Sequence, residues 1–206
     1  GFAAGGSAYY GASSDDQVFP WFFGLWRYLS SSLPDAGERK RLTALLARIA
    51  AALEGHRWKV PCDPVAFGFR GSFARPRVPD STRLLFILRA LYGLTGEAHW
   101  LEQYRLHLAA PVAGTGLTKL AHCAQGIRYE PWAEPPAAGP SLAERALLVG
   151  PQRAVHERET QPPLWTTSMV AAALRGLVEM EEDDAIRASF LEGLDATAAS
   201  AAAHIQ

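Results

Sequence analysis

One pattern occurs three times along the chain and limits the folds open to it. A segment that is apolar around most of its circumference is followed, after a short turn, by a segment that is apolar on one face only. A helix that is apolar on all sides must be buried on all sides, whereas a one-sided helix covers a core. We therefore predict an all-α fold of antiparallel hairpins in two layers, with buried helices inside and amphipathic helices outside. The three pairs span residues 16–31 and 35–54, 80–95 and 98–109, and 165–180 and 184–204.

The first buried segment, Val18 to Leu29, is the most apolar of the six, and two acids directly precede it. Trp21 and Trp26 lie inside this segment, and we expect both in the core. Asp is a preferred N-cap, and a second acid in the first turn favours the helix dipole. Asp15 and Asp16 are therefore interpreted as caps of the helix, and one of them also as a group that faces a ligand.

The lengths of the connections predict where a site would form. Turns within each hairpin are short, whereas the connections before the buried helices are long: residues 1–14, 55–79 and 110–164. In an antiparallel stack, these long connections and the leading ends of the buried helices meet at one end. Long loops on a shared face are where binding groups usually lie. Segments 119–126 and 141–149 are a candidate fourth, degraded pair.

Composition excludes several classes of function. A formal charge of −1 gives no field that would recruit nucleic acid or an anionic membrane, and Arg27 interrupts an apolar run too short to span a bilayer. Cys62 and Cys123 are read as free thiols or as one disulfide. The histidines have no metal-ligand spacing, and no phosphate-binding glycine motif is present. We expect no cofactor, no metal, no nucleic acid and no membrane partner.

The hairpin pattern and the segment S-S-D-D-Q-V-F-P-W-F-F-G-L-W, from Ser13 to Trp26, resemble the α/α-toroid group called six-hairpin glycosidase-like. The resemblance implies a carbohydrate-active domain that binds or cleaves a glycosidic substrate at the loop face, as a glycoside hydrolase or a polysaccharide lyase does. A closed toroid in this group has more hairpins than the three or four found here. We therefore expect residues 1–206 to form one domain, either an open arc or part of a larger toroid.

Candidate catalytic residues are the carboxylates of the predicted loop face. Glycosidic cleavage by the usual route needs two carboxylates roughly 5–9.5 Å apart across the bond. Neighbouring side chains point differently, so Asp15 and Asp16 do not both belong to one pair. Asp80 and Glu130 are the preferred partners, and Asp80 is also interpreted as a helix N-cap.

Candidate binding residues are aromatic, cationic or imidazole side chains in or beside the long connections. Aromatic rings stack on the C–H faces of sugars, and guanidinium groups suit carboxylates such as those of uronic acids. Loop arginines such as Arg75 and Arg77 are alternatively expected to pair with acids of the protein itself, and His122 is interpreted as a base or as a structural residue. The assigned substrate-binding residues are Tyr10, Arg70, His122, Tyr129 and Trp132, with Trp165 beside them.

Two other functional classes fit the same pattern. One is a noncatalytic helical-repeat scaffold whose loop face binds a protein or peptide. The other is a toroid that takes a hydrophobic or isoprenoid ligand in an interior lined by Trp21, Trp26 and Phe86. An incomplete arc would expose apolar flanks, so we expect either a homo-oligomer or a missing segment. The chain starts at Gly1 without an initiator Met or a signal-type region, so we expect that residues precede Gly1. A cytoplasmic location is favoured over a secreted one.

Overall fold

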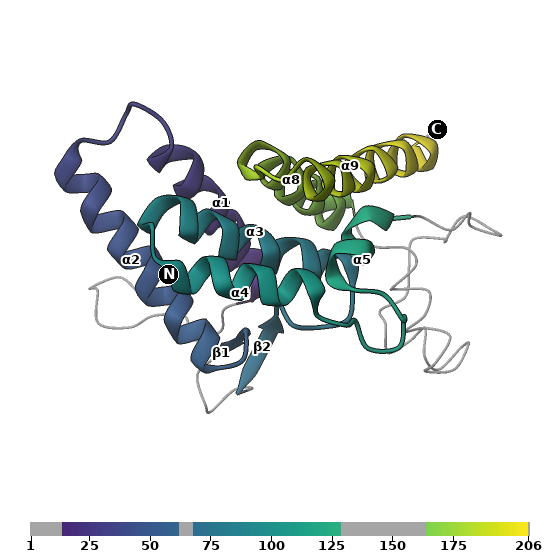
Figure 1. Cartoon of the computed structure of the whole chain (residues 1–206), viewed down its shortest axis with the longest axis horizontal. Helices are drawn as coiled ribbons and strands as arrows, with labels where there is room; N and C mark the ends of the chain where they lie inside the picture. The colour runs from purple at the N-terminus through teal and green to yellow at the C-terminus, as the bar shows by residue number, and fades with distance from the viewer. Residues whose placement is uncertain (1–13, 62–67, 129–163, 206) are drawn as a thin grey trace, which may run out of the picture.

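The structure, a computed structural model, describes residues 14–61, 68–128 and 164–205 (Figure 1). Within these ranges it is almost entirely helical, which confirms the predicted all-α class. The helices begin and end within three residues of the predicted bounds. They are α1 (Asp15–Leu29), α2 (Ala36–Gly55), α3 (Val78–Thr95), α4 (Ala98–Ala109), α5 (Lys119–Gln125), α8 (Leu164–Met180) and α9 (Asp184–Ile205), with strands β1 (Lys59–Pro61) and β2 (Phe69–Ser72).

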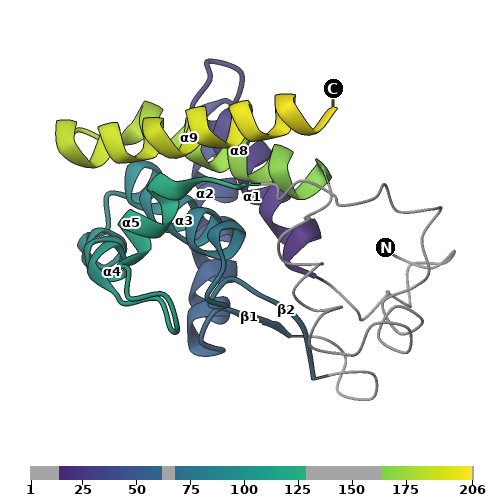
Figure 2. The same ribbon diagram turned by 90° about the vertical axis from the view of Figure 1, so that its right-hand side faces the viewer.

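Helix α3 is the centre of the molecule. It packs against α1, α2, α4, α5 and α8, and the α8–α9 hairpin lies above it in both ribbon views (Figures 1 and 2). Every residue from 80 to 91 is buried, so the prediction of a helix buried on all sides is correct for α3. The helix ends at Gly96, whose φ of 71° is a left-handed conformation that glycine adopts without a Cβ clash.

Helices α1 and α8 contact α3 and also each other, whereas α2, α4 and α9 each pack on the preceding helix of their own hairpin. Helix α2 also contacts α3, and α9 also contacts α5, so the outer helices are not confined to their own hairpins. The prediction that α1 is buried on all sides is wrong. Trp26 is buried, as expected, but Trp21 is 36% exposed because α1 uses only one side to contact its neighbours.

A small antiparallel sheet follows α2 and was not predicted. Strands β1 and β2 pair from Lys59↔Ser72 to Pro61↔Phe69, with an irregularity after Val60. Its contact with α1 depends on Gly71: a Cβ there would lie 2.3 Å from Oδ1 and 2.4 Å from the backbone nitrogen of Asp15. The sheet thus holds the start of α1 and carries the chain toward the start of α3.

Helices α5 and α9 approach so closely that their backbones touch. A Cβ on Gly193 would lie 2.0 Å from the carbonyl oxygen of Cys123. Thr197 completes the junction, since its Oγ1 accepts from the N–H of Ile127 at 2.9 Å and donates to the carbonyl of Gly193 at 2.7 Å. Cys123 is buried and free, which agrees with the first of the two predicted alternatives, whereas Cys62 and the candidate helix 141–149 lie outside the described residues.

Near the last turns of α3, polar groups join α3, α4 and the turn between α8 and α9. Arg89 donates to the carbonyl of Met180 at 2.5 Å, and Tyr104 donates to Oε2 of Glu181 at 2.5 Å. The other oxygen of Glu181 accepts the N–H groups of Glu182 and Asp183. Burial, reinforced by the hydrogen bond to Glu181, raises the pKa of Tyr104 strongly.

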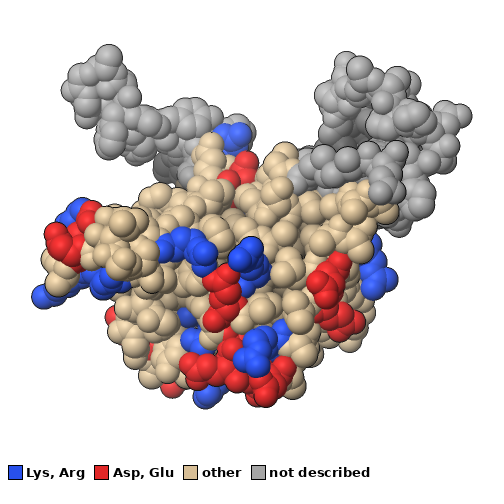
Figure 3. All heavy atoms as spheres, turned by 90° about the horizontal axis from the view of Figure 1, so that it is seen from above, with Lys and Arg blue, Asp and Glu red and all other residues tan. Residues whose placement is uncertain are grey.

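On the face seen in Figure 3, neither positive nor negative surface charge dominates. Lysine and arginine side chains lie next to aspartate and glutamate side chains there, with uncharged surface between the groups. None of the described helices is long and apolar enough to cross a membrane.

Candidate functional site

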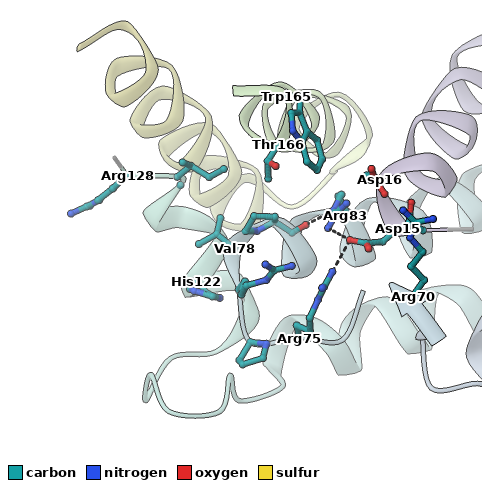
Figure 4. Close-up of a pocket in the computed structure, with 16 residues that line it drawn as sticks. Asp15, Asp16, Arg70, Arg75, Val78, Arg83, His122, Arg128, Trp165 and Thr166 are labelled. Carbon is teal, nitrogen blue, oxygen red and sulfur yellow. Dashed lines mark hydrogen bonds and ion pairs between the residues drawn. The ribbon is translucent and has the colours of Figure 1, made fainter. Parts of the chain in front are cut away.

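A cavity of about 520 Å³ lies where α1, α3 and α8 begin (Figure 4). This convergence confirms that the leading ends of the three inner helices share one face. The loop before α3 and the end of α5 complete the wall. The lining residues are Ser14, Asp15, Asp16, Arg70, Arg75, Pro76, Arg77, Val78, Pro79, Arg83, His122, Gly126, Ile127, Arg128, Trp165 and Thr166.

Arg83 is the buried cation of this site, at 2% exposure. Its Nη2 donates to Oδ2 of Asp15 and to Oδ1 of Asp80, both at 2.7 Å, and its Nε donates to the carbonyl of Pro79 at 2.8 Å. The two carboxylates therefore meet at one guanidinium nitrogen. They lie on the same ion-pair cluster and do not oppose each other across the cavity.

Two loop arginines bind the same carboxylates. Arg75 donates through Nη2 to Oδ2 of Asp15 at 2.7 Å, and Arg77 donates through Nε to Oδ2 of Asp80 at 2.8 Å. The interpretation that Arg75 and Arg77 pair with acids of the protein is confirmed. Three guanidinium groups share two carboxylates in this arginine–aspartate cluster, which leaves it with a surplus of positive charge.

The capping interpretation is wrong for Asp15, Asp16 and Asp80, because all three lie inside helices. The N-cap of α1 is Ser14, so Asp15 is already helical, and the N-cap of α3 is Arg77. Asp80 sits in the first turn of α3 and is fully buried, because the cluster supplies hydrogen-bond donors for both of its oxygens. Asp16 is helical as well; it lines the cavity and has no side-chain hydrogen bond or ion pair with another described residue.

His122 reaches the cavity wall from α5. It is buried, and its Nδ1 lies 3.5 Å from Oγ of Ser81. Burial, and then the charge of Lys119, lowers the pKa of His122, so the imidazole is neutral at pH 7. Among the described residues, no three His, Cys, Asp or Glu side chains are grouped as metal ligands would be.

The structure brings several predicted residues together and adds others. Asp15, Asp16, Arg70 and His122 line the cavity, Asp80 lies beside it in the cluster, and Trp165 stands at its edge, 53% exposed. Sequence reasoning missed Arg83 and Arg128. An arginine three residues after Asp80 in an apolar segment was a usable signal for Arg83, whereas Arg128 had none. Outside the described residues lie Tyr10, Tyr129, Glu130 and Trp132.

The site differs in charge from the molecule as a whole. Among the described residues, five arginines line the cavity, against three carboxylates on or beside its wall, whereas the whole chain has a formal charge of −1. The positive ends of three helix dipoles point to the same region, and such ends favour anions. Chemically, the arrangement is suited to holding an anionic group close to an exposed indole ring.

Comparison of the chain with protein-family models, with curated proteins and with solved structures gives no match.

Proposed function

We propose that the cavity binds an acidic carbohydrate. The observation that carries the proposal is the surplus of arginines at the junction of α1, α3 and α8, next to the exposed ring of Trp165. Guanidinium groups bind anionic oxygens in a fixed geometry, and an exposed indole offers a flat surface to the C–H face of a sugar ring. In Figure 4, Trp165 and Arg75 lie on opposite sides of the cavity, as a ligand with one apolar and one anionic part requires.

Binding is favoured over cleavage by the state of the carboxylates. A hydrolytic pair needs two carboxylates that flank the bond with space between them. Asp15 and Asp80 are instead both bonded to Arg83, which assigns them to holding the arginines in place. Asp16 is the lining carboxylate that is available to a ligand among the described residues. Hydrolase or lyase activity through Asp15, Asp16, Asp80 and Glu130 stays a prediction.

We also propose that the hairpins form an arc of the α/α-toroid type. Three inner helices that contact one another, with their leading ends at one face and outer helices behind them, support this arrangement. An isoprenoid-type interior has less support, since Trp26 and Phe86 pack edge to face at 5.2 Å and are buried. A concave site also fits a small ligand better than the flat face expected of a protein-binding scaffold.

Calorimetric titration with matched neutral and acidic oligosaccharides tests the proposal. Trp165→Ala should weaken binding of the acidic sugar by about tenfold, since a stacked ring contributes about 0.5–1.5 kcal/mol beyond its burial. Trp21→Ala is the matched control, because Trp21 is an exposed indole that does not line the cavity. Equal affinity for neutral and acidic sugars, or equal loss in both variants, would contradict the proposal.

A further inference from the structure

Resting on this proposed function, we infer that a second binding surface lies on the β1–β2 hairpin, and that the ligand is a chain of acidic sugar units. One unit of the chain occupies the cavity and the next units lie across the hairpin. This hairpin surface is defined by His56, Lys59 and Phe69. None of the three residues lines the cavity.

Phe69 is the centre of the hairpin surface. Its side chain is 46% exposed at the start of β2. The ammonium group of Lys59 lies 5.4 Å from the centre of this ring, and the centre of the His56 ring lies 5.8 Å from it. An exposed ring beside a cation offers a flat face to the C–H groups of a sugar and a charge to its acidic group.

The cations of this region are not neutralised by carboxylates among the described residues. Lys59 and, two residues before it, Arg57 are exposed, and neither forms an ion pair with a described residue. Glu54, the nearest preceding acid, pairs instead with His99 of α4 at 2.9 Å. Exposed cations that the protein leaves unpaired are suited to an anionic ligand.

The turn between α2 and β1 is strained. Arg57 and Trp58 both have positive φ values, of 55° and 60°, in the left-handed region that favours glycine. The turn is held by Trp58, whose ring is buried at 4% exposure and whose N–H donates to the carbonyl of Leu53 at 2.7 Å. Strain that the surroundings enforce in this way is found at functional sites. Here it fixes His56 and Lys59 on either side of the turn, both against Phe69.

A bulge in β2 joins the hairpin surface to the cavity. Gly71 and Phe69 pair with successive residues of β1, so Arg70 between them is the extra residue of the strand. A bulge of this kind re-aims a side chain. Arg70 lines the cavity, and Figure 4 shows its side chain at the cavity edge. A sugar chain that leaves the cavity past Arg70 therefore meets Phe69 next.

Two neighbouring surfaces with the same chemistry favour a repeating ligand. A monosaccharide in the cavity leaves the hairpin surface unused, whereas a polyuronide places one carboxylate near the arginines and another near Lys59. Linking the two binding events raises affinity. A single-stranded nucleic acid also combines flat rings with regular charge. It is less favoured, because a formal charge of −1 gives the protein no field that recruits a phosphate backbone.

Titration of the full chain with galacturonate and with its linear dimer, tetramer and hexamer tests the inference. We expect the hexamer to bind much more than tenfold tighter than the monomer, beyond the roughly sixfold gain that six equivalent units give statistically. A gain no larger than the statistical one would overturn the hairpin surface and leave the acidic-sugar proposal standing. Failure of every galacturonate would overturn both. A single-stranded oligonucleotide of equal charge that binds as tightly as the hexamer would overturn the sugar chain.

Variants of the hairpin surface locate the second contact. Phe69→Ala should lower the hexamer affinity by about tenfold and leave the monomer affinity unchanged, with Trp21→Ala as the exposed aromatic control. Lys59→Gln should lower the hexamer affinity by about threefold. Its matched control is Lys40→Gln, an exposed lysine near the other end of α2. An unchanged hexamer affinity in both hairpin variants, or an equal loss for monomer and hexamer, would overturn the placement of the chain.

Discussion

The two ends of α3 both hold a buried arginine near carboxylates, and they differ in how completely the polar groups are matched. Near the C-terminal end, Arg89 donates to a carbonyl, and both oxygens of Glu181 are occupied by Tyr104 and by backbone N–H groups. At the N-terminal end, three arginines share two carboxylates beside a cavity.

The difference separates a structural polar cluster from a binding site. At the C-terminal end, both oxygens of the buried Glu181 carboxylate accept hydrogen bonds from the protein, so this carboxylate is satisfied without a ligand. Where donors exceed acceptors and a cavity adjoins them, a ligand can supply the missing acceptors. Four predictions test whether the two ends differ in this way.

The largest expected effect is the loss of Arg83. Arg83→Met removes the shared donor of Asp15 and Asp80 and leaves two carboxylates buried with fewer partners, so the free energy of unfolding should fall by about 3–5 kcal/mol. Urea unfolding measures the change. Arg175→Met, at an exposed ion pair, is the control and should change stability by less than about 0.5 kcal/mol. A loss in Arg83→Met no larger than that of the control would show that the cluster does not stabilise this end.

A second substitution tests the contact between β2 and the start of α1. Gly71→Ala places a methyl group against the backbone and side chain of Asp15, and we expect a loss of about 2–3 kcal/mol together with weaker ligand binding. Gly24→Ala on α1 meets no atom within 4 Å and should stabilise the helix by about 0.5–1 kcal/mol. Thermal unfolding of both variants gives the comparison. Equal shifts of Tm with the same sign in both variants would contradict the close approach of Gly71 to Asp15.

The C-terminal end of α3 is tested by Tyr104→Phe. The change leaves Oε2 of the buried Glu181 without the Tyr104 donor, so stability should fall by about 1–2 kcal/mol while affinity for the acidic sugar stays unchanged. Tyr28→Phe, which removes a comparable bond to Glu38 at a more exposed position, should cost less. Reduced sugar affinity in Tyr104→Phe, measured by calorimetry, would show that the two ends are coupled.

The smallest effect concerns pH. Burial lowers the pKa values of His107 and His122 below their ordinary value of 6.5, so the unfolded chain binds more protons than the folded chain once the pH falls below about 6.5. Stability should therefore be complete above that pH and decline toward pH 5.5, by less than about 1 kcal/mol for each histidine. His122→Gln should flatten the decline in a series of urea titrations. A decline of the same slope in this variant would exclude His122 as its source.

The sequence predicts the helices well because their boundaries have local causes. Asp35 caps α2 by accepting the N–H of Glu38 at 2.8 Å, and Gly96 ends α3. Apolar periodicity then assigns the segments between such signals. It does not say which neighbours a helix has, and Trp21 was wrongly expected in the core for that reason.

The candidate site was predicted in position and partly in composition. Asp15, Asp16 and Arg70 were expected on the loop face because the pattern of short and long connections fixes which helix ends meet. The pairing of Arg83 with Asp15, across 68 residues, follows from tertiary packing and has no local pattern. The sequence therefore does not show that Asp15 and Asp80 share Arg83.

The contact between α5 and α9 helps to shape the cavity wall, although α9 itself does not line the cavity. Gly126 turns with a φ of 63° directly beside Gly193 and Thr197, and Ile127 and Arg128 follow it into the cavity wall. No described residue of α9 lines the cavity, yet α9 fixes the direction in which the chain leaves α5. A chain truncated before α9 should therefore lose ligand binding, although α9 does not line the cavity. A bulky residue at Gly193 should weaken ligand binding in the same indirect way.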